Sequence, residues 1–276
     1  MTAETRSGAI VERPPLPARR WTGERILGHA MLILWIVLGA GTILFLVQSW
    51  RPDLFARYAP AYLSGLRVTL TLVALSIVLG ALLSFPIAFA RMSRNRVLSW
   101  LGYAYVYFFR GTPLIAQTFL VYYGFGSFRP QLEAFGLWAF FREAWYCALL
   151  AFTLNTAAYQ AEILRGAIES IPRGQWEGAA SLGLSKWQTM RMIILPQALI
   201  VALRPYGNEI VLMIKGSAIV AIITVYDLMG ETRRAYSRTF DFQTYIWAAL
   251  LYLAVVEVLR NIVDWIERRI TRHLKR

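Results

Sequence analysis

The sequence predicts an all-α integral membrane protein, a polytopic bundle of about six transmembrane helices. Hydrophobic residues make up 57% of the 276 residues and charged residues only 16%, whereas soluble domains have about 45–50% and about 25%. The apolar residues also arrive in blocks, each long enough to cross a hydrocarbon core about 30 Å thick. The single cysteine, Cys147, and the 2 histidines exclude a disulfide framework within the chain and a Cys/His zinc site.

Six apolar runs are the candidate spans: residues 27–47, 68–90, 101–128, 144–161, 192–214 and 244–266. The first two carry no formal charge, and Arg110 interrupts the third. The fifth gives the weakest signal because Arg204 and Glu209 fall inside it, together with Pro196 and Pro205. We therefore expect six crossings, each by one helix.

Lysine and arginine in the connecting segments predict the orientation. If the N-terminus is cytoplasmic, the inside segments hold about twice as many of these residues as the outside segments, as the positive-inside rule requires. We therefore expect both termini in the cytoplasm. Residues 1–26, rich in proline and charge, indicate a flexible cytoplasmic tail. Residues 27–50 indicate an additional, retained transmembrane helix, because the run exceeds the roughly 7–15 residues of a signal-peptide core. The basic C-terminus, residues 267–276, is expected to bind the anionic inner leaflet.

Several classes of protein are excluded. The net charge of +13 does not indicate nucleic-acid binding, because the basic residues lie between apolar blocks rather than along one exposed face. The sequence has no G-x-x-x-x-G-K-[ST] loop for nucleotide phosphates, no G-x-S-x-G elbow and no H-E-x-x-H zinc motif. We therefore expect no enzymatic activity and no cofactor in this chain. Uphill transport would take its energy from another chain or from an ion gradient.

The loop between the fourth and fifth runs, residues 164–192, carries the strongest functional signal. Residues 175–182 suit a short helix whose small side chains allow another surface to approach closely, and Gly183 is placed to end it. Such a helix can act as a peg in a partner's groove. Composition alone favours a plainer alternative, a loop helix that lies on the membrane surface.

This loop resembles the corresponding loop in the membrane subunits of bacterial ABC importers. Its spacing E-x-A-x(3)-G-x(9)-I-x-L-P matches the signature of that family, in which the loop helix docks into a cleft of the ATPase subunit. The resemblance assigns ATPase coupling to Glu177, Gly178, Ala179, Ala180, Gly183, Leu195 and Pro196. Gly178 departs from the usual alanine and lowers helix propensity by up to about 1 kcal/mol, which predicts slightly looser docking.

Three further segments resemble the polar amino-acid branch of the family, the importers of histidine, lysine, arginine, ornithine and opines. They are residues 65–70 (GLRVTL), 109–114 (FRGTPL) and 154–163 (LNTAAYQAEI). The similarity covers about residues 60–270 and implies a five-helix transmembrane domain to which the N-terminal helix is an addition. It also implies a permease subunit that moves a polar amino acid, cationic ones included, or an opine across the bacterial inner membrane by alternating access.

The same resemblance implies the partners. They are an ABC ATPase dimer that binds ATP and magnesium, a periplasmic substrate-binding protein and a second membrane subunit, for which a related chain is favoured over a homodimer. The alternative from another class is a gradient-driven carrier or channel without an ATPase, for which the 164–192 loop would be dispensable. A purely structural anchor, the third reading, would tolerate replacement of Asn155 and Glu162.

Polar residues inside the spans mark the candidate path. A charge at mid-helix costs about 2.5–3.5 kcal/mol and tends to face a cavity or a partner. Asn155, Tyr159 and Glu162 follow one another at i, i+4 and i+7 and therefore share one helical face. We expect this face to line the translocation path, with Glu162 available to a substrate ammonium or paired with Arg165. Helix–helix hydrogen bonding is the alternative.

The third run contains a candidate gate at Arg110, Thr112 and Pro113. Pro113 removes a backbone donor and disfavours helix at Thr112, whose hydroxyl can satisfy a freed backbone group. Arg110 is expected to bind a carboxylate or to pair with an acidic residue of the chain. The break is a candidate gate because transporters place gates at such interruptions. The alternative is a plain kink with Arg110 extending to the cytoplasmic interface.

Asn208, Glu209, Lys215 and Ser217 form the remaining polar group, in and after the fifth run. Lys215 is expected either to pair with Glu209 or to join a gate or substrate contact near the outer mouth. Residues 217–242 should lie on the outer membrane surface, where charged side chains can dock a binding protein. These side chains are Asp227, Glu231, Arg233, Arg234 and Arg238.

Overall fold

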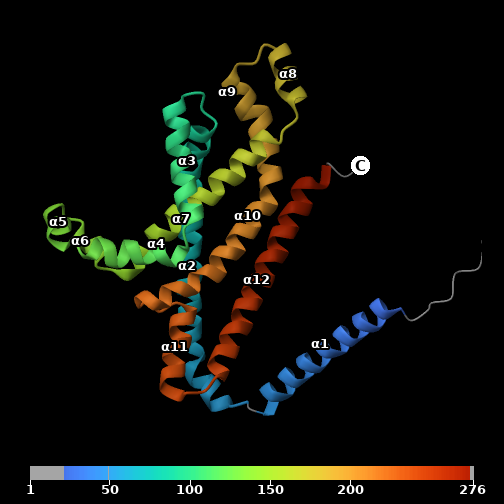
Figure 1. Cartoon of the computed structure of the whole chain (residues 1–276), viewed down its shortest axis with the longest axis vertical. Coiled ribbons are helices and arrows are strands. Elements are labelled where there is room, and N and C mark those ends of the chain that lie inside the picture. The colour runs from blue at the N-terminus through green and yellow to red at the C-terminus, as the bar shows by residue number, and fades with distance from the viewer. Residues whose placement is uncertain (1–21, 49, 274–276) are drawn as a thin grey trace, which may run out of the picture. The chain divides into compact units, whose positions relative to one another are not determined.

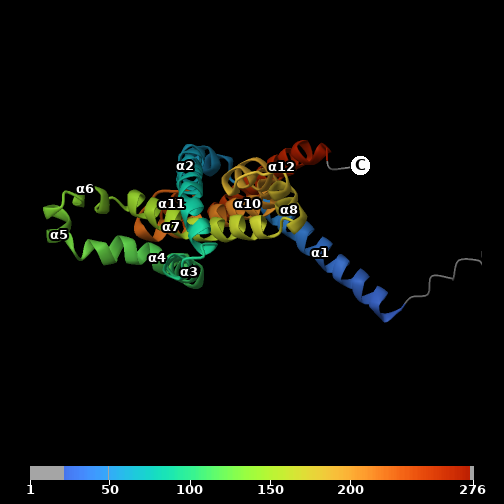
Figure 2. The same cartoon turned by 90° about the horizontal axis from the view of Figure 1, so that it is seen from above.

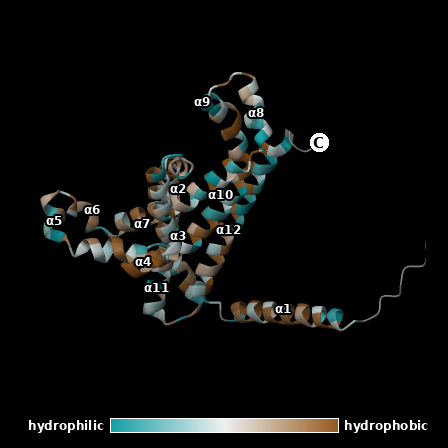
Figure 3. Cartoon of the chain, turned by 45° about the horizontal axis from the view of Figure 1, so that its top comes forward, coloured by the Kyte–Doolittle hydropathy of each residue, from teal (hydrophilic) through white to brown (hydrophobic). Residues whose placement is uncertain are grey.

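The computed structural model describes residues 22–48 and 50–273. The chain divides into two units, Met1–Arg51 and Pro52–Arg276, which are taken one at a time. Residues 1–21 of the expected tail and residues 274–276 of the expected basic C-terminus lie outside the described residues. In the first unit, α1 (Gly23–Gln48) is one helix of 26 residues, about 39 Å long. Figure 3 shows its mostly hydrophobic colouring.

The second unit is built from helices that alternate between long and short, and no strand occurs among the described residues. The long helices are α2 (Pro52–Arg91), α3 (Arg96–Gly111), α7 (Ala144–Glu169), α10 (Leu195–Ser217) and α12 (Gln243–Ile270). The short ones are α4 (Leu114–Phe119), α5 (Arg129–Ala134), α6 (Trp138–Phe141), α8 (Arg173–Ser181), α9 (Lys186–Thr189) and α11 (Leu228–Thr239). Two π-helical segments, Leu120–Gly124 and Met190–Ile194, and two 3₁₀ segments, Ala218–Ile223 and Thr271–His273, continue them.

By length and hydropathy, four stretches of the described residues can cross a membrane. They are α1, α2, α12 and the continuous stretch Lys186–Ile223, which contains α10. α7 covers the fourth predicted run but includes polar residues such as Asn155 and Gln160, which lower its hydropathy. The third predicted run, 101–128, is not one straight crossing as expected. α3 ends at Gly111 and α4 leaves it steeply (Figure 1), because Pro113 divides the run.

α2 is longer than its apolar run, because it begins at Pro52 rather than near residue 68. Hydropathy falls at Arg67, so the predicted span ends there. The additional turns are helical because α11 and α12 cover them with a hydrophobic cluster. Its buried members are Tyr58, Tyr62, Leu228, Ala235, Trp247 and Ala248. The Tyr62 hydroxyl also donates a hydrogen bond of 2.7 Å to the carbonyl of Thr244.

The main core lies between α2 and α7, which pack along each other (Figures 1 and 2). Small residues permit this close approach, since a Cβ on Gly80 would lie 2.5 Å from the Thr156 methyl carbon. Leu72 and Phe152 are fully buried where the two helices meet.

The short helices lie at different ends of the second unit, with α8 and α9 at one end and α11 at the other (Figure 1). α5 and α6 project sideways from the bundle (Figure 2).

Gly65 on α2 provides a test of the outer packing. A Cβ added there would lie 2.7 Å from the carbonyl oxygen of Asp227, and backbone cannot move aside as a flexible side chain can. Overpacking of this kind costs about 1–3 kcal/mol. We expect Gly65→Ala to lower the melting midpoint in detergent by several degrees. Gly126→Ala is the control because nothing lies within 4 Å of the added carbon, and equal midpoints for the two variants would contradict the packing.

Candidate functional site

The break between α3 and α4 is held by polar contacts. Thr112 has an extended backbone, and its hydroxyl donates to the carbonyl of Phe108 at 2.8 Å, which also accepts from the Thr112 amide at 3.1 Å. The carbonyl that loses its helical donor at Pro113 is that of Phe109, so Thr112 does not take the role expected of it. Sequence reasoning missed Gln117, whose amide nitrogen donates to the carbonyls of Phe109 (2.9 Å) and Thr112 (3.1 Å). Only the fold brings Gln117 back to the end of α3, so no local pattern could have indicated it.

Asn155 belongs to this break and does not line a cavity. Its side chain is buried, and its amide nitrogen donates to the Phe109 carbonyl and to Gln117 Oε1, both at 3.0 Å. These contacts are the helix–helix hydrogen bonding that the sequence left open as the alternative to a lining role for Asn155. They form because α3 and α4 both pack against this part of α7, and each accepts one of the two amide hydrogen bonds, α3 through Phe109 and α4 through Gln117.

Glu162 on α7 is the centre of an ion-pair cluster that joins α2, α3 and α7. Its carboxylate accepts hydrogen bonds from Nε of Arg91 at 3.0 Å and from Arg165 at 3.1 and 2.9 Å. Nη1 of Arg110 lies 3.9 Å away, and Arg165 also donates to Glu169 at 2.6 Å. The Glu162 cluster therefore contains the expected pair with Arg165. The arginines also leave Glu162 little capacity for a substrate ammonium.

Two cavities open on the Glu162 cluster. One, of about 330 Å³, lies among α2, α3 and α7, and the other, of about 420 Å³, lies among α3, α7 and α10. Arg110, Tyr159 and Glu162 line both. The Arg110 guanidinium lies over the Tyr159 ring, 5.1 Å from its centroid, a cation–π contact. The structure thus brings these three expected residues together at an accessible surface.

Glu209 and Ser217 face the interior of the bundle. Glu209 is 5% exposed and accepts a hydrogen bond of 2.9 Å from the Thr156 hydroxyl. Ser217 is fully buried and donates to the carbonyl of Ile214 at 2.8 Å. The expected ion pair between Glu209 and Lys215 does not form within the described part of the chain, because a separation of six residues places two side chains about 120° apart around an α-helix.

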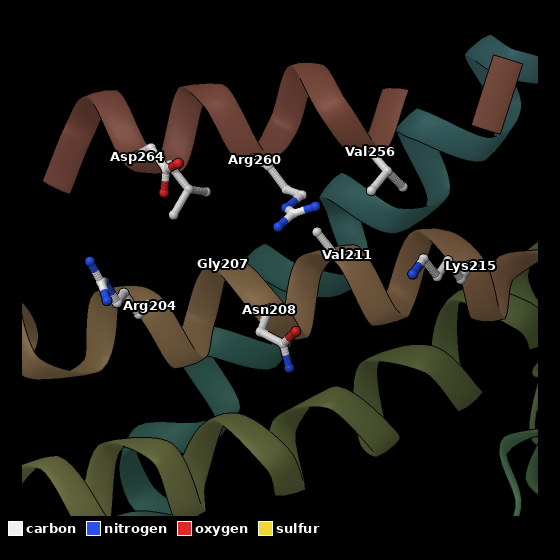
Figure 4. Close-up of a pocket in the computed structure, with 9 residues that line it drawn as sticks. Arg204, Gly207, Asn208, Val211, Lys215, Val256, Arg260 and Asp264 are labelled. Atoms are coloured by element: carbon white, nitrogen blue, oxygen red, sulfur yellow. The ribbon is translucent and has the colours of Figure 1, made fainter. Parts of the chain in front are cut away.

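Asn208 and Lys215 line a different surface, an open groove of about 460 Å³ between α10 and α12. Figure 4 shows Arg260 extending from α12 into this α10–α12 groove, with Arg204 and Lys215 of α10 on either side along it. The complete lining is Arg204, Gly207, Asn208, Val211, Lys215, Val256, Arg260, Val263 and Asp264. Arg204 and Arg260 were not selected from the sequence as site residues, since their proximity depends on how the two helices pack.

The loop helix forms where it was predicted, as α8, Arg173–Ser181. Gly183 has a φ of +72°, and the amides of Gly183 and Leu184 donate to the carbonyls of Ala180 (3.0 Å) and Ala179 (3.1 Å). This pattern is a Schellman stop, which favours glycine. Ala179 is buried against the bundle, so the expected coupling surface loses it. The exposed residues of the surface are Glu177, Gly178, Ala180 and Gly183.

α8 is connected to α10 through the segment between them and one side-chain hydrogen bond. The π-helical segment Met190–Ile194 leads directly into Leu195 and Pro196, where the missing proline N–H disturbs the regular hydrogen bonding. The Gln197 amide donates to Gln175 Oε1 at 3.2 Å. A displacement of α8 is therefore expected to move the start of α10.

Large apolar side chains are exposed beside α8. Leu182 is 78% exposed and Trp187 is 68% exposed. Exposed apolar groups that lie together mark a surface for a partner or a membrane. The exposed end of the loop therefore has the composition of a contact surface.

Asp227, expected among the outer surface charges, is instead fully buried. One carboxylate oxygen caps α11 by accepting from the Gly230 amide at 2.8 Å. The other accepts from Thr69 at 3.5 Å and from Tyr252 at 3.4 Å. No cation pairs with it in residues 22–48 or 50–273. Burial raises the pKa of Asp227 to about 6.

This pKa predicts a pH dependence of stability. Folded Asp227 binds its proton more tightly than the unfolded chain, so the free energy of unfolding should fall as the pH rises from about 4 to about 6 and then level off. Asp227→Asn keeps the capping oxygen and should flatten this dependence, as measured by the melting midpoint across that pH range. Glu133→Gln, on the exposed α5, should leave it as in the wild type. An unchanged slope in Asp227→Asn would contradict the assignment.

Comparison with known proteins places these features in a family. Residues 76–272 match the family model described as "Binding-protein-dependent transport system inner membrane component". The chain is 41% identical over 217 residues to the nopaline transport system permease protein NocM of Agrobacterium fabrum, covering 78% of this chain and 90% of that one. It is 38% identical over 212 residues to the arginine ABC transporter permease protein ArtM of Escherichia coli, covering 77% and 95%.

A solved structure is similar to the same region. The crystal structure of an amino acid ABC transporter with histidines contains a chain that superposes with a TM-score of 0.70 at 34% sequence identity. The match covers 78% of this chain and 96% of that one. The helical architecture of the second unit is therefore one already seen in a transporter.

Proposed function

Because the chain belongs to the family of binding-protein-dependent transport system inner membrane components and is thus the permease subunit of an ABC importer, we propose that its substrate is an amino acid or an opine. The relatives NocM and ArtM are named as permeases for nopaline and for arginine, and the proposed substrate class includes both compounds. The permease is a multi-pass protein of the bacterial membrane, and ATP is hydrolysed on a partner ATPase. A substrate-binding protein is the other partner of this class.

The geometry of α8 is the observation that supports ATP coupling through this loop. α8 exposes Glu177, Gly178 and Ala180, and Gly183 ends it sharply. In the proposed mechanism the ATPase dimer holds this surface and, on closing around ATP, displaces α8. Gln175 and Gln197 pass that displacement to α10, and the bundle alternates between outward-open and inward-open states.

The Glu162 cluster is the proposed inner gate. Arg110 lies at the end of α3, immediately before the break, and its distance of 3.9 Å to Glu162 is the longest in the cluster. This contact is therefore the one that a small movement of α3 relative to α7 would break. The two cavities lined by Arg110, Tyr159 and Glu162 would then join into a path.

The second membrane subunit is proposed to be a related chain rather than a copy of this one. The family resemblance supports this proposal, because the importers of histidine-type amino acids pair two related membrane chains. The binding protein is proposed to dock at the end that carries α11, opposite α8. That placement, together with the distribution of lysine and arginine, supports cytoplasmic termini.

Reconstitution tests this proposal. The complete importer, with its ATPase, second membrane subunit and binding protein, is placed in proteoliposomes with ATP inside, and uptake of labelled L-arginine and nopaline is measured. We expect accumulation of at least one of them that requires ATP and survives ionophores. Accumulation that needs an ion gradient but no ATP would instead support a carrier.

A further inference from the structure

The α10–α12 groove contains charges that nothing in the described part of the chain neutralises. Arg260 on α12 and Lys215 on α10 line it, and neither has an ion-pair or hydrogen-bond partner among residues 22–48 and 50–273. Arg204 is different, because its Nε donates to both carboxylate oxygens of Glu267 at 2.7 Å. Asp264 is the groove's single acidic lining residue.

Both cations belong to helical stretches that are long and apolar enough to cross a membrane. Lys215 is within the membrane-crossing stretch Lys186–Ile223 and Arg260 within α12. A cationic side chain at the centre of a span costs about 2.5–3.5 kcal/mol against lipid. The groove therefore faces a water-filled path or a polar partner. Figure 4 shows Arg260 directed into the space between the two helices.

The remaining balance of charge is positive. After Arg204 is paired with Glu267, Asp264 opposes both Arg260 and Lys215, and Asn208 adds an amide that donates hydrogen bonds. Guanidinium and ammonium groups bind carboxylates well, the guanidinium with two parallel hydrogen bonds. We infer that the α10–α12 groove is a carboxylate-binding subsite on the translocation path, an inference that rests on the proposed function.

This subsite narrows the substrate class. Glu162, the carboxylate that would suit an ammonium group, is already occupied by arginines, so the path is cationic at both places. A solute with several carboxylates gains from every such group, whereas a cationic solute must be held through its α-carboxylate. Opines carry more carboxylates than the amino acids from which they are made, and they are the favoured substrates.

The first experiment does not depend on the substrate. Asn208→Cys is introduced into the complete importer in proteoliposomes, and its rate of modification by anionic methanethiosulfonate ethylsulfonate is compared with the rate for the cationic trimethylammonium analogue. The parent chain gives the background from Cys147, which is buried. We expect the anionic reagent to be favoured several-fold. Adding Arg260→Gln should remove the preference and Arg260→Lys should keep it, while Arg272→Gln, which lies outside the groove, should change nothing.

Two outcomes overturn the inference. A cysteine at position 208 that does not react, or that prefers the cationic reagent, means that lipid or protein fills the groove. The rates are also measured in phosphatidylcholine vesicles with and without phosphatidylglycerol. If phosphatidylglycerol slows the anionic reagent at position 208 in the parent sequence but not in Arg260→Gln, the groove binds a lipid phosphate and not a solute carboxylate, because the surface potential of the bilayer acts on both variants alike.

The second experiment separates this inference from the proposed function. In the wild-type importer, competition against labelled nopaline is measured with nopaline, L-arginine and L-argininamide, which lacks the carboxylate. We expect the amide to compete about tenfold less well than L-arginine and Arg260→Gln to abolish the difference. An amide that competes equally in the wild type overturns the subsite. If the wild type takes up neither nopaline nor L-arginine, the proposed function fails, and the cysteine rates still decide the subsite.

Discussion

Replacing Gly183 by valine is expected to reduce ATP-driven uptake at least tenfold while the protein still inserts into the membrane. Gly183 has a φ of +72°, a conformation that a β-branched residue adopts only under strain of the order of 1–2 kcal/mol. Relief of that strain would undo the stop formed by the amides of Gly183 and Leu184. The exposed face of α8 would then no longer have the shape that the ATPase is proposed to hold.

The matched control lies in the same helix. Gly178 has open space around it and alanine improves helix propensity by up to about 1 kcal/mol, so Gly178→Ala should retain or raise uptake. Glu177→Arg reverses a charge on the exposed face and should behave like Gly183→Val. ATPase stimulation by loaded binding protein is measured in parallel. Normal stimulation in Gly183→Val would show that α8 does not transmit the signal.

Glu162→Gln is expected to abolish uptake and to lower stability. The substitution removes the negative charge that pairs with Arg91 and Arg165. It leaves the partly buried Arg91 without a carboxylate partner and Arg165 with Glu169 alone. Breaking a buried pair costs about 3–5 kcal/mol, and partial exposure of this cluster reduces the expected cost to about 2 kcal/mol. The melting midpoint should therefore fall by several degrees.

Glu169→Gln is the control for this prediction. Glu169 also binds Arg165, at 2.6 Å, but its side chain is 54% exposed, so its loss should matter little. Uptake and melting are measured for both variants. If the two variants behave alike, the Glu162 cluster is only one of several surface ion pairs and not a gate.

Local patterns allowed several features to be predicted from the sequence. The α8 helix, its stop at Gly183 and the break at Pro113 each follow from a few neighbouring residues whose backbone preferences decide the conformation. The outer turns of α2 could not be predicted from hydropathy, because they are stabilised by α11 and α12, which lie far away in the sequence.

The site was harder to predict because contacts between helices determine whether a polar side chain binds another helix or faces a cavity. Asn155 and Glu209 occur in patterns typical of a lining, yet Gln117 and Thr156 bind them inside the bundle. No local sequence pattern marks Arg260 as a site residue. It becomes part of a groove only because α12 packs against α10. A helical wheel shows which way each side chain points from one helix, but it does not show which neighbouring helix that side chain will contact.

The most direct test of the account is accumulation by the complete importer after residues 175–184 are replaced by the same residues in scrambled order. With ATP inside the proteoliposomes and the binding protein outside, the wild type should concentrate nopaline or L-arginine above the external level. The scrambled variant should insert and assemble but should accumulate nothing. Equal accumulation by the two, or accumulation by the wild type without the ATPase, would contradict coupling through α8.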